Sequence, residues 1–160
     1  MLVTVAERLG YTFRGYVLKP MGSTTRIERL EQPQAGSTTS ITASRASSQT
    51  AARVTYLELF SSGDLPLGKT ILHRKFNEAM VAFLDCLKQL GEHVEKSSTR
   101  TRSGEVRRLP YTIDKDKIHG VSIKLGISQD EAWTGACKYT LTCCKFLLAY
   151  ASNMVSTAPR

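Results

Sequence analysis

Residues 75–96 carry the pattern that most constrains how this chain of 160 residues can fold. Apolar side chains recur there at steps of three and four, the spacing of one face of an α-helix of about six turns. They are Phe76, Met80, Phe83, Leu84, Leu87, Leu90 and Val94. Polar residues occupy the opposite face, which we expect to lie in water: Asn77, Glu78, Asp85, Lys88, Gln89, Glu92 and Glu95. Such a helix must bury its apolar face against other elements of a domain.

The other segments predict short strands and a second long helix. Residues 1–9 are typical of the last turns of a helix that Gly10 ends, so we expect the chain to be a fragment of a longer protein. Alternation and turn residues predict strands over 11–20, 25–30, 54–60, 109–113 and 121–125, with 61–72 and 114–120 as connections. Ser128 and Glu131 form a capping box that begins a helix ending near residue 153. Its expected apolar stripe is Trp133, Cys137, Leu141, Cys144, Leu148 and Ala151.

This order of elements predicts an α+β fold. The strands are joined by short connections, which favour antiparallel pairing, and each group of strands is followed by a long helix. Residues 32–53 are rich in Ser, Thr and Ala and nearly devoid of large apolar side chains, so we expect a disordered insertion. The chain thus divides into sheet-plus-helix units over 10–96 and 97–154, with a polar tail over 155–160.

Charge points to acidic partners without naming one. The formal net charge is +8, from 22 basic and 14 acidic residues. Residues 96–108 hold much of the excess positive charge. Such a run is typical of a solvated loop, and the alternative is that it binds nucleic acid. No aromatic residue lies among these cations to stack on bases, so we predict no nucleic-acid partner. No apolar run approaches the ~20 residues that span a bilayer.

The cysteines and histidines predict no metal site. Cys86, Cys137, Cys143 and Cys144 contain no Cys-x-x-Cys pair, and the chain has only three histidines. We expect the four cysteines to serve as small buried apolar residues in a reducing cytosol. The sequence shows no convincing catalytic pair. His93 lies seven residues beyond Cys86 on the same predicted helix, about two turns away, which is too far for proton transfer between them.

Residues 63–70 match the phosphate-binding pattern G-x-x-x-x-G-K-T and raise the alternative of a nucleotide-binding protein. In that motif backbone amides and Lys69 would hold phosphates, and Thr70 would hold magnesium. Against it, the preceding strand alternates, whereas a strand of a parallel sheet is apolar on both faces. Too few later strands follow to build a parallel sheet around the site.

Several blocks resemble the Beclin family of autophagy proteins. They are Lys75-Phe-Asn-Glu-Ala-Met-Val-Ala-Phe-Leu-Asp-Cys-Leu, Val94-Glu-Lys, Leu109-Pro-Tyr, Val121-Ser-Ile-Lys and Glu131-x-Trp133-Thr. The segments beginning at Leu65-Pro-Leu-Gly-Lys and Lys138-Tyr-Thr-Leu-Thr look like the filamentous-fungal form. The resemblance implies a β-α repeated, autophagy-specific (BARA) domain of sheet-plus-helix repeats. Residues 1–9 would end the first repeat, and 10–96 and 97–154 would be the second and third.

The same resemblance implies a non-catalytic, membrane-targeting subunit of a class III phosphatidylinositol 3-kinase complex. No cofactor is expected for this subunit. Its expected partners are the catalytic kinase, a pseudokinase scaffold, a coiled-coil subunit and an anionic membrane surface. Its expected location is cytoplasmic, as a peripheral protein at the membranes of the phagophore assembly site, endosomes or vacuole. The expected processes are autophagosome assembly and vacuolar or endosomal protein sorting.

The resemblance also implies a membrane-contact loop before the long helix. Animal members carry consecutive aromatic residues at the positions of Thr70, Ile71 and Leu72, where this chain has none. The loss of aromatic side chains argues against deep insertion. A shallower contact remains, through Leu65, Leu67, Lys69, Thr70, Ile71, Leu72 and Arg74, with the cations near anionic headgroups. The alternative is that these aliphatic residues cap the core.

Overall fold

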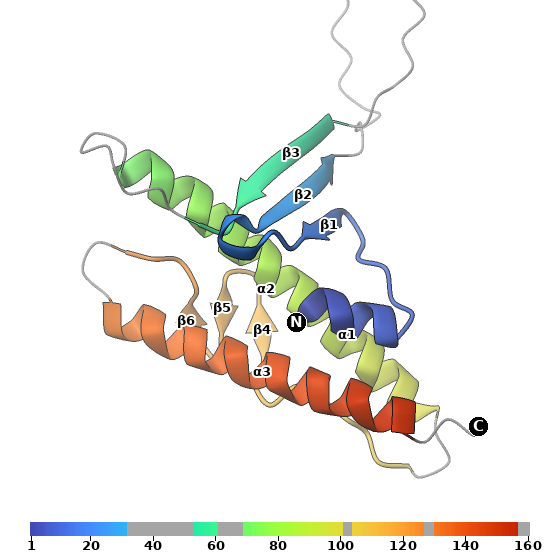
Figure 1. The fold of residues 1–160 in the computed structure, drawn as a ribbon. Coiled ribbons are helices and arrows are strands. Elements are labelled where there is room, and N and C mark those ends of the chain that lie inside the picture. The colour runs from blue at the N-terminus through green and yellow to red at the C-terminus, as the bar shows by residue number, and fades with distance from the viewer. Residues whose placement is uncertain (32–52, 61–68, 101–103, 127–129, 157–160) are drawn as a thin grey trace, which may run out of the picture.

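A computed structural model of the chain describes residues 1–31, 53–60, 69–100, 104–126 and 130–156. Its elements are α1 (Leu2–Arg8), β1 (Tyr16–Lys19), the 3₁₀ helix η1 (Gly22–Thr24), β2 (Arg26–Glu31), β3 (Arg53–Glu58), α2 (Lys69–Thr99), β4 (Ile113–Asp114), β5 (Lys117–Ile118), β6 (Val121–Ser122) and α3 (Asp130–Ser156). Figure 1 shows α2 running through the middle of the molecule, between strands β1–β3 and helix α3. Antiparallel sheets followed by helices confirm the predicted α+β class.

Helix α2 is buried along two faces. The predicted stripe is confirmed in its second half, where Leu84, Leu87, Leu90 and Val94 are fully buried. A second stripe, of small side chains, is buried beside it at Ala79, Ala82 and Cys86. The small residues let a sheet approach closely, while the large ones fill the wider space toward α3.

Strands β1, β2 and β3 form an antiparallel sheet in that order and cover the small-residue face of α2. Ile27 and Leu57 are opposite each other in register, and both are buried against Ala79 and Ala82. Side chains alternate across a strand. The outer face therefore carries Tyr56, which is 62% exposed.

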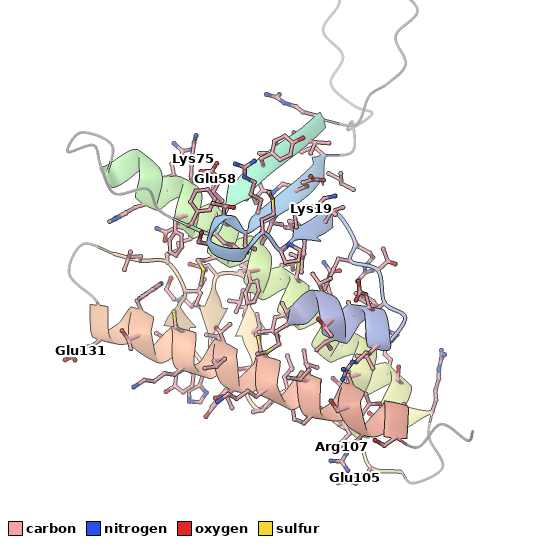
Figure 2. All side chains as sticks on the ribbon, in the orientation of Figure 1. Lys19, Glu58, Lys75, Glu105, Arg107 and Glu131 are labelled. Atoms are coloured by element: carbon pink, nitrogen blue, oxygen red, sulfur yellow. The ribbon has the colours of Figure 1, made fainter. Side chains whose placement is uncertain are left out.

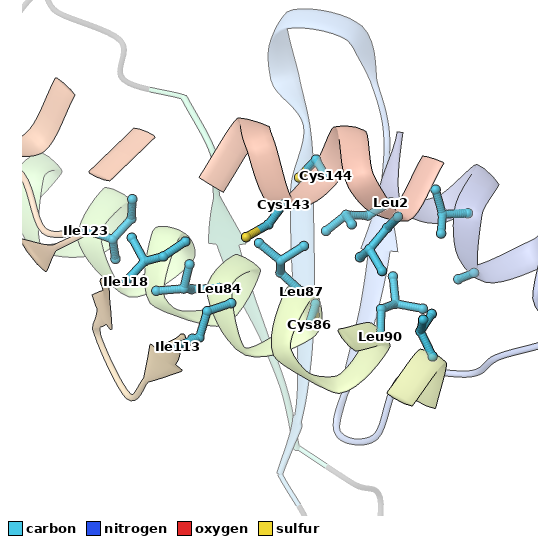
Figure 3. Packing of buried hydrophobic residues seen from close by; sticks show 14 of the residues in the cluster. Leu2, Leu84, Cys86, Leu87, Leu90, Ile113, Ile118, Ile123, Cys143 and Cys144 are labelled. Carbon is cyan, nitrogen blue, oxygen red and sulfur yellow. The ribbon is translucent and has the colours of Figure 1, made fainter. Parts of the chain in front are cut away.

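The main core lies between α2, α3 and the small β4–β6 sheet. Figure 3 shows Leu84 and Leu87 of α2 near Cys143 of α3, with Ile118 and Ile123 closing one end. Each fully buried leucine or isoleucine contributes about 1.5–3 kcal/mol relative to an exposed one. Within the described residues no ion pair joins α2 to α3, so this apolar cluster holds the two long helices together.

The β4–β6 sheet differs from the predicted strand pair. The expected connection over 114–120 contains the central strand β5, and all three strands have two residues each. Lys115 and His119 adopt positive φ, which turns the chain tightly enough to place a strand between the two turns. Ile118 on β5 is fully buried, which fixes the strand in the core.

Helix α3 buries a different stripe from the predicted one. Its fully or nearly buried residues are Ala136, Thr140, Cys143, Cys144, Leu147 and Ala151, whereas Leu141 is 47% exposed. Cys144 and Ala151 were predicted correctly, but most of the stripe is displaced by one residue, or about 100° around the helix. The prediction followed the larger side chains, whereas most of the residues that α3 buries in the core are small.

Helix α1 confirms the expectation for the first residues. Leu2, Val5 and Ala6 are buried, and the helix packs against α3 at the other end of the chain. Gly10 follows with φ of 61°, the left-handed conformation that ends helices without a Cβ clash. Of the predicted insertion over 32–53, residues 32–52 lie outside the described residues and Arg53 begins β3. Of the predicted tail over 155–160, residues 155–156 end α3 and the rest lie outside the described residues. In the described part of the chain, no helix is long and apolar enough to cross a membrane.

The two glycines inside long helices should respond oppositely to alanine. A Cβ at Gly91 would lie 2.4 Å from Leu109 Cδ1 and 2.6 Å from its Cγ, whereas a Cβ at Gly135 meets nothing within 4 Å. Gly91→Ala should therefore lower the free energy of unfolding by about 1–3 kcal/mol through overpacking. Gly135→Ala should raise it by up to about 1 kcal/mol because alanine is the better helix former. Denaturant titration of both variants checks the pair, and equal effects would contradict this packing of Leu109.

Candidate functional site

The predicted membrane-contact segment is helical over part of its length. Leu65 and Leu67 lie outside the described residues, whereas Lys69, Thr70, Ile71 and Leu72 begin α2 instead of ending a loop. Pro66 and Gly68 are the last helix-breaking residues before the helix. No breaker follows before Phe76, and adding a residue to an existing helix is inexpensive, so the helix extends back to Lys69.

The described end of this segment is cationic and exposed. The Arg74 side chain is 83% exposed, and its Nε lies 3.5 Å from Glu78 Oε1. Exposed pairs of this kind contribute about 0–1 kcal/mol, so the guanidinium can exchange this partner for another anion. Lys75 is also exposed, and Figure 2 shows it at the end of α2 that points away from α1. The first turn of α2 has no acidic residue, which leaves the positive end of the helix dipole unopposed by side chains.

Two polar residues of α2 that we expected in water connect it to other segments. Asn77 accepts a hydrogen bond from Leu125 N at 2.7 Å and donates one to Leu125 O at 3.1 Å. Gln89 is only 9% exposed and bonds the segment before β1. The predicted water-facing role of both residues is therefore wrong. Gln89 continues the small-residue stripe and lies against the loop before β1, whereas Asn77 lies on another side of α2, against the segment after β6.

The basic stretch over 96–108 is partly neutralised. Arg108 Nε lies 2.7 Å from Glu95 Oε1, and Arg107 Nη2 lies 2.8 Å from Glu105 Oε2, the pair labelled in Figure 2. Ser98 Oγ accepts a hydrogen bond from Arg107 N, which ties the returning chain to the last turn of α2. Arg102 lies outside the described residues.

The phosphate-binding pattern lacks its usual surroundings in the described part of the chain. Residues 63–68 fall outside that part, and Lys69 and Thr70 are the first residues of α2. The preceding strand β3 is the edge of an antiparallel sheet. Every strand pair of the described residues is antiparallel, whereas the motif belongs to a strand of a parallel sheet.

The thiols are buried and weakly acidic. Desolvation, with the nearby Asp85 charge, raises the pKa of Cys86 to about 12, and desolvation raises that of Cys144 to about 11. Burial also raises the pKa of Cys143 and of the half-buried Cys137. Among the described residues, no group of three or more His, Cys, Asp or Glu side chains is placed to hold a metal ion. These thiols are suited to packing rather than to nucleophilic chemistry.

Gln89 organises a site that the sequence analysis missed. Its Oε1 accepts hydrogen bonds from Tyr11 Oη at 3.1 Å and Arg14 N at 2.9 Å. Its Nε2 donates to Arg14 O at 3.2 Å and to Asp85 Oδ2 at 3.1 Å. The available signal was the 3-4-3 spacing of Ala79, Ala82, Cys86 and Gln89, which marks a second buried stripe.

Comparison with known proteins identifies the relatives of this chain. Residues 1–153 match the family model described as the Apg6 BARA domain. The chain is 56% identical over 158 residues to vacuolar protein sorting-associated protein 30 of Gibberella zeae, covering 99% of the chain and 31% of the relative. It is 38% identical over 153 residues to vacuolar protein sorting-associated protein atg6 of Schizosaccharomyces pombe, covering 96% and 28%. A Beclin-1-like protein of Drosophila melanogaster is 32% identical over 159 residues, covering 96% and 31%. The chain thus spans about a third of the length of these relatives.

Thiol labelling checks the inert character of the cysteines. At pH 8 a thiol of pKa about 12 is ionised in only about one molecule in ten thousand, so folded Cys86 should resist iodoacetamide. Cys137 should react first because it alone of the four is not fully buried. Mass spectrometry should find all four modified in guanidinium. Rapid labelling of Cys86 in the folded chain would contradict this assignment.

Proposed function

The chain belongs to the Apg6 BARA-domain family, and from this membership we propose that it acts as a non-catalytic part of the autophagy and vacuolar sorting machinery. The match over residues 1–153 carries the proposal, supported by 56% identity to a protein named for vacuolar protein sorting. The role is therefore one of binding and positioning.

The finer proposal is membership of a class III phosphatidylinositol 3-kinase complex. In it the chain contributes a BARA domain beside the catalytic kinase, the pseudokinase scaffold and a coiled-coil subunit. It works at the cytoplasmic surface of the phagophore assembly site, endosomes or the vacuole. The support is the Beclin-family resemblance of the sequence, together with relatives named for vacuolar sorting.

The membrane surface in this proposal is the N-terminal end of α2. Lys69 and Arg74 bring cations to a helix end whose dipole is positive, and each cation near an anionic membrane contributes about 1 kcal/mol. Ile71 and Leu72 supply apolar side chains in the first turn, with Leu65 and Leu67 upstream. In Figure 1 this end of α2 lies far from α1 and the chain's N-terminus. The proposed contact is therefore shallow, electrostatic and aliphatic.

A chimera tests the cellular role. The segment of the Gibberella zeae relative that matches this chain is replaced by the chain, in a strain lacking the native protein. We expect both delivery of a fluorescent cytoplasmic protein to the vacuole and sorting of a vacuolar hydrolase to be restored. The kinase should also co-purify with the chimera. A stably expressed chimera that restores neither process would overturn the proposed function.

Vesicle sedimentation tests the membrane contact. Binding of the chain should increase with the phosphatidylserine content of the vesicles and fall sharply in Ile71→Asp/Leu72→Asp, because charged groups resist transfer into the interface. The matched control is Leu141→Asp/Met154→Asp, which places the same two charges on exposed apolar positions of α3. If both double variants bind as the original chain does, the end of α2 is not the contact.

A further inference from the structure

Two cavities on the loop between α1 and β1 share a wall. The larger, of about 300 Å³, lies between this loop and α2; we call it the polar cavity. The smaller, of about 190 Å³, lies between α1 and β1; we call it the apolar cavity. Tyr11 and Thr12 line both. A single extended ligand lying across these two residues would therefore reach both cavities.

The shared wall is held in place without a ligand. Three hydrogen bonds of Gln89 fix Tyr11 and the backbone of Arg14 onto α2, and a fourth, to Asp85 of the same helix, holds the amide itself in place. The His93 ring packs on Tyr11 with ring centroids 4.8 Å apart. Since Gln89 is 9% exposed and its amide is fully hydrogen-bonded, the wall is preorganised and costs little further ordering on binding.

The polar cavity carries cations that are free to bind an acid. Helix α2 lines it with Gln89, Glu92, His93 and Lys96, which share one helix face at steps of three and four. Within the described residues, neither the Arg14 guanidinium nor the Lys96 ammonium forms an ion pair, and both side chains are exposed. Carboxylates of a ligand bound in this cavity would therefore lie beside cations that have no other partner of opposite charge among the described residues.

The Glu92 carboxylate makes the polar cavity more favourable for an acidic peptide than for a compact anion. Its carboxylate lines the same cavity and, within the described residues, forms no ion pair. It repels a compact, multiply charged ion, but it can accept a hydrogen bond from a peptide N–H. A chain with both backbone N–H groups and acidic side chains satisfies the cations and Glu92 together.

The apolar cavity supplies an anchor next to this charged site. Val3, Ala6 and Glu7 of α1 line it from one side, and Phe13, Val17 and Leu18 from the other, so its lining is mostly apolar and an acidic side chain of a ligand is excluded from it by Glu7. Neighbouring apolar and cationic sites are complementary to an apolar residue followed by acidic ones.

We propose that an acidic peptide segment of a partner protein docks across Tyr11 and Thr12, with an apolar side chain in the apolar cavity and carboxylates at Arg14 and Lys96. The surface is separate from the proposed membrane contact, since Glu92 follows Arg74 by about 27 Å along α2 at ~1.5 Å per residue. It adds a protein partner to the proposed function and does not depend on vesicle binding.

Peptide display on the full chain tests this. Selection from a library of random dodecapeptides should enrich sequences that combine an apolar residue with Asp or Glu. By fluorescence polarisation, Arg14→Glu/Lys96→Glu should raise the Kd of those peptides by roughly tenfold or more, through the loss of charge-assisted hydrogen bonds. The matched control Lys138→Glu/Lys145→Glu makes the same charge change on exposed positions of α3 and should leave Kd unchanged.

Three results would overturn the proposal. They are an absence of enriched peptides, enriched peptides without acidic residues, and equal losses in the test and control variants. Circular dichroism confirms that each variant is folded, and both replaced side chains are exposed, so loss of the fold is not expected. Vesicle binding of the Arg14→Glu/Lys96→Glu variant, measured in parallel, separates failure here from failure of the membrane contact.

Discussion

The structure depends on one helix that is buried on two sides. Helix α2 packs Ala79 and Ala82 against the β1–β3 sheet and Leu84, Leu87 and Leu90 against α3 and the β4–β6 sheet. Small side chains on one face let the sheet approach α2 closely, while the large ones on the other face fill the wider space toward α3. The leucines contribute about 1.5–3 kcal/mol each by burial, whereas exposed ion pairs such as Arg74–Glu78 contribute about 0–1 kcal/mol. Apolar packing on α2 therefore determines where both sheets lie.

Burial on two sides leaves polar side chains of α2 beneath other backbone, and each is satisfied there. Asn77 makes paired hydrogen bonds with Leu125, and Gln89 bonds both backbone groups of Arg14. Leaving such groups unpaired would cost about 1–3 kcal/mol each. Satisfying them fixes the register of the loop before β1 and of the segment after β6, so polar contacts specify positions that apolar packing alone would not.

The positive charge of the chain is spread unevenly between these surfaces. Glu95 and Glu105 pair with Arg108 and Arg107, so part of the basic stretch after α2 is neutralised within the chain. The N-terminal end of α2 and the polar cavity keep cations that other molecules can reach. The two regions are suited to different partners: the first combines cations with aliphatic residues of one helical turn, and the second is a preformed cavity with mixed charge.

The sequence by itself determined the fold class, the family and the large-residue face of α2, because helical spacing and matched residue blocks are local patterns. It also identified α1 and its end at Gly10. The buried stripe of α3, the strand β5 and the burial of Gln89 could not be predicted from the sequence. Each depends on which distant segment of the chain packs against it. Ala136 and Cys143 are buried because α3 turns this face into the core that it forms with α2 and the β4–β6 sheet. Gln89 is buried because the loop over 11–14 folds back onto α2 from 75 residues away at Arg14. Only tertiary structure decided these, because the burial of a residue depends on the segments that pack on it: Leu141 is 47% exposed, whereas the polar Gln89 is buried.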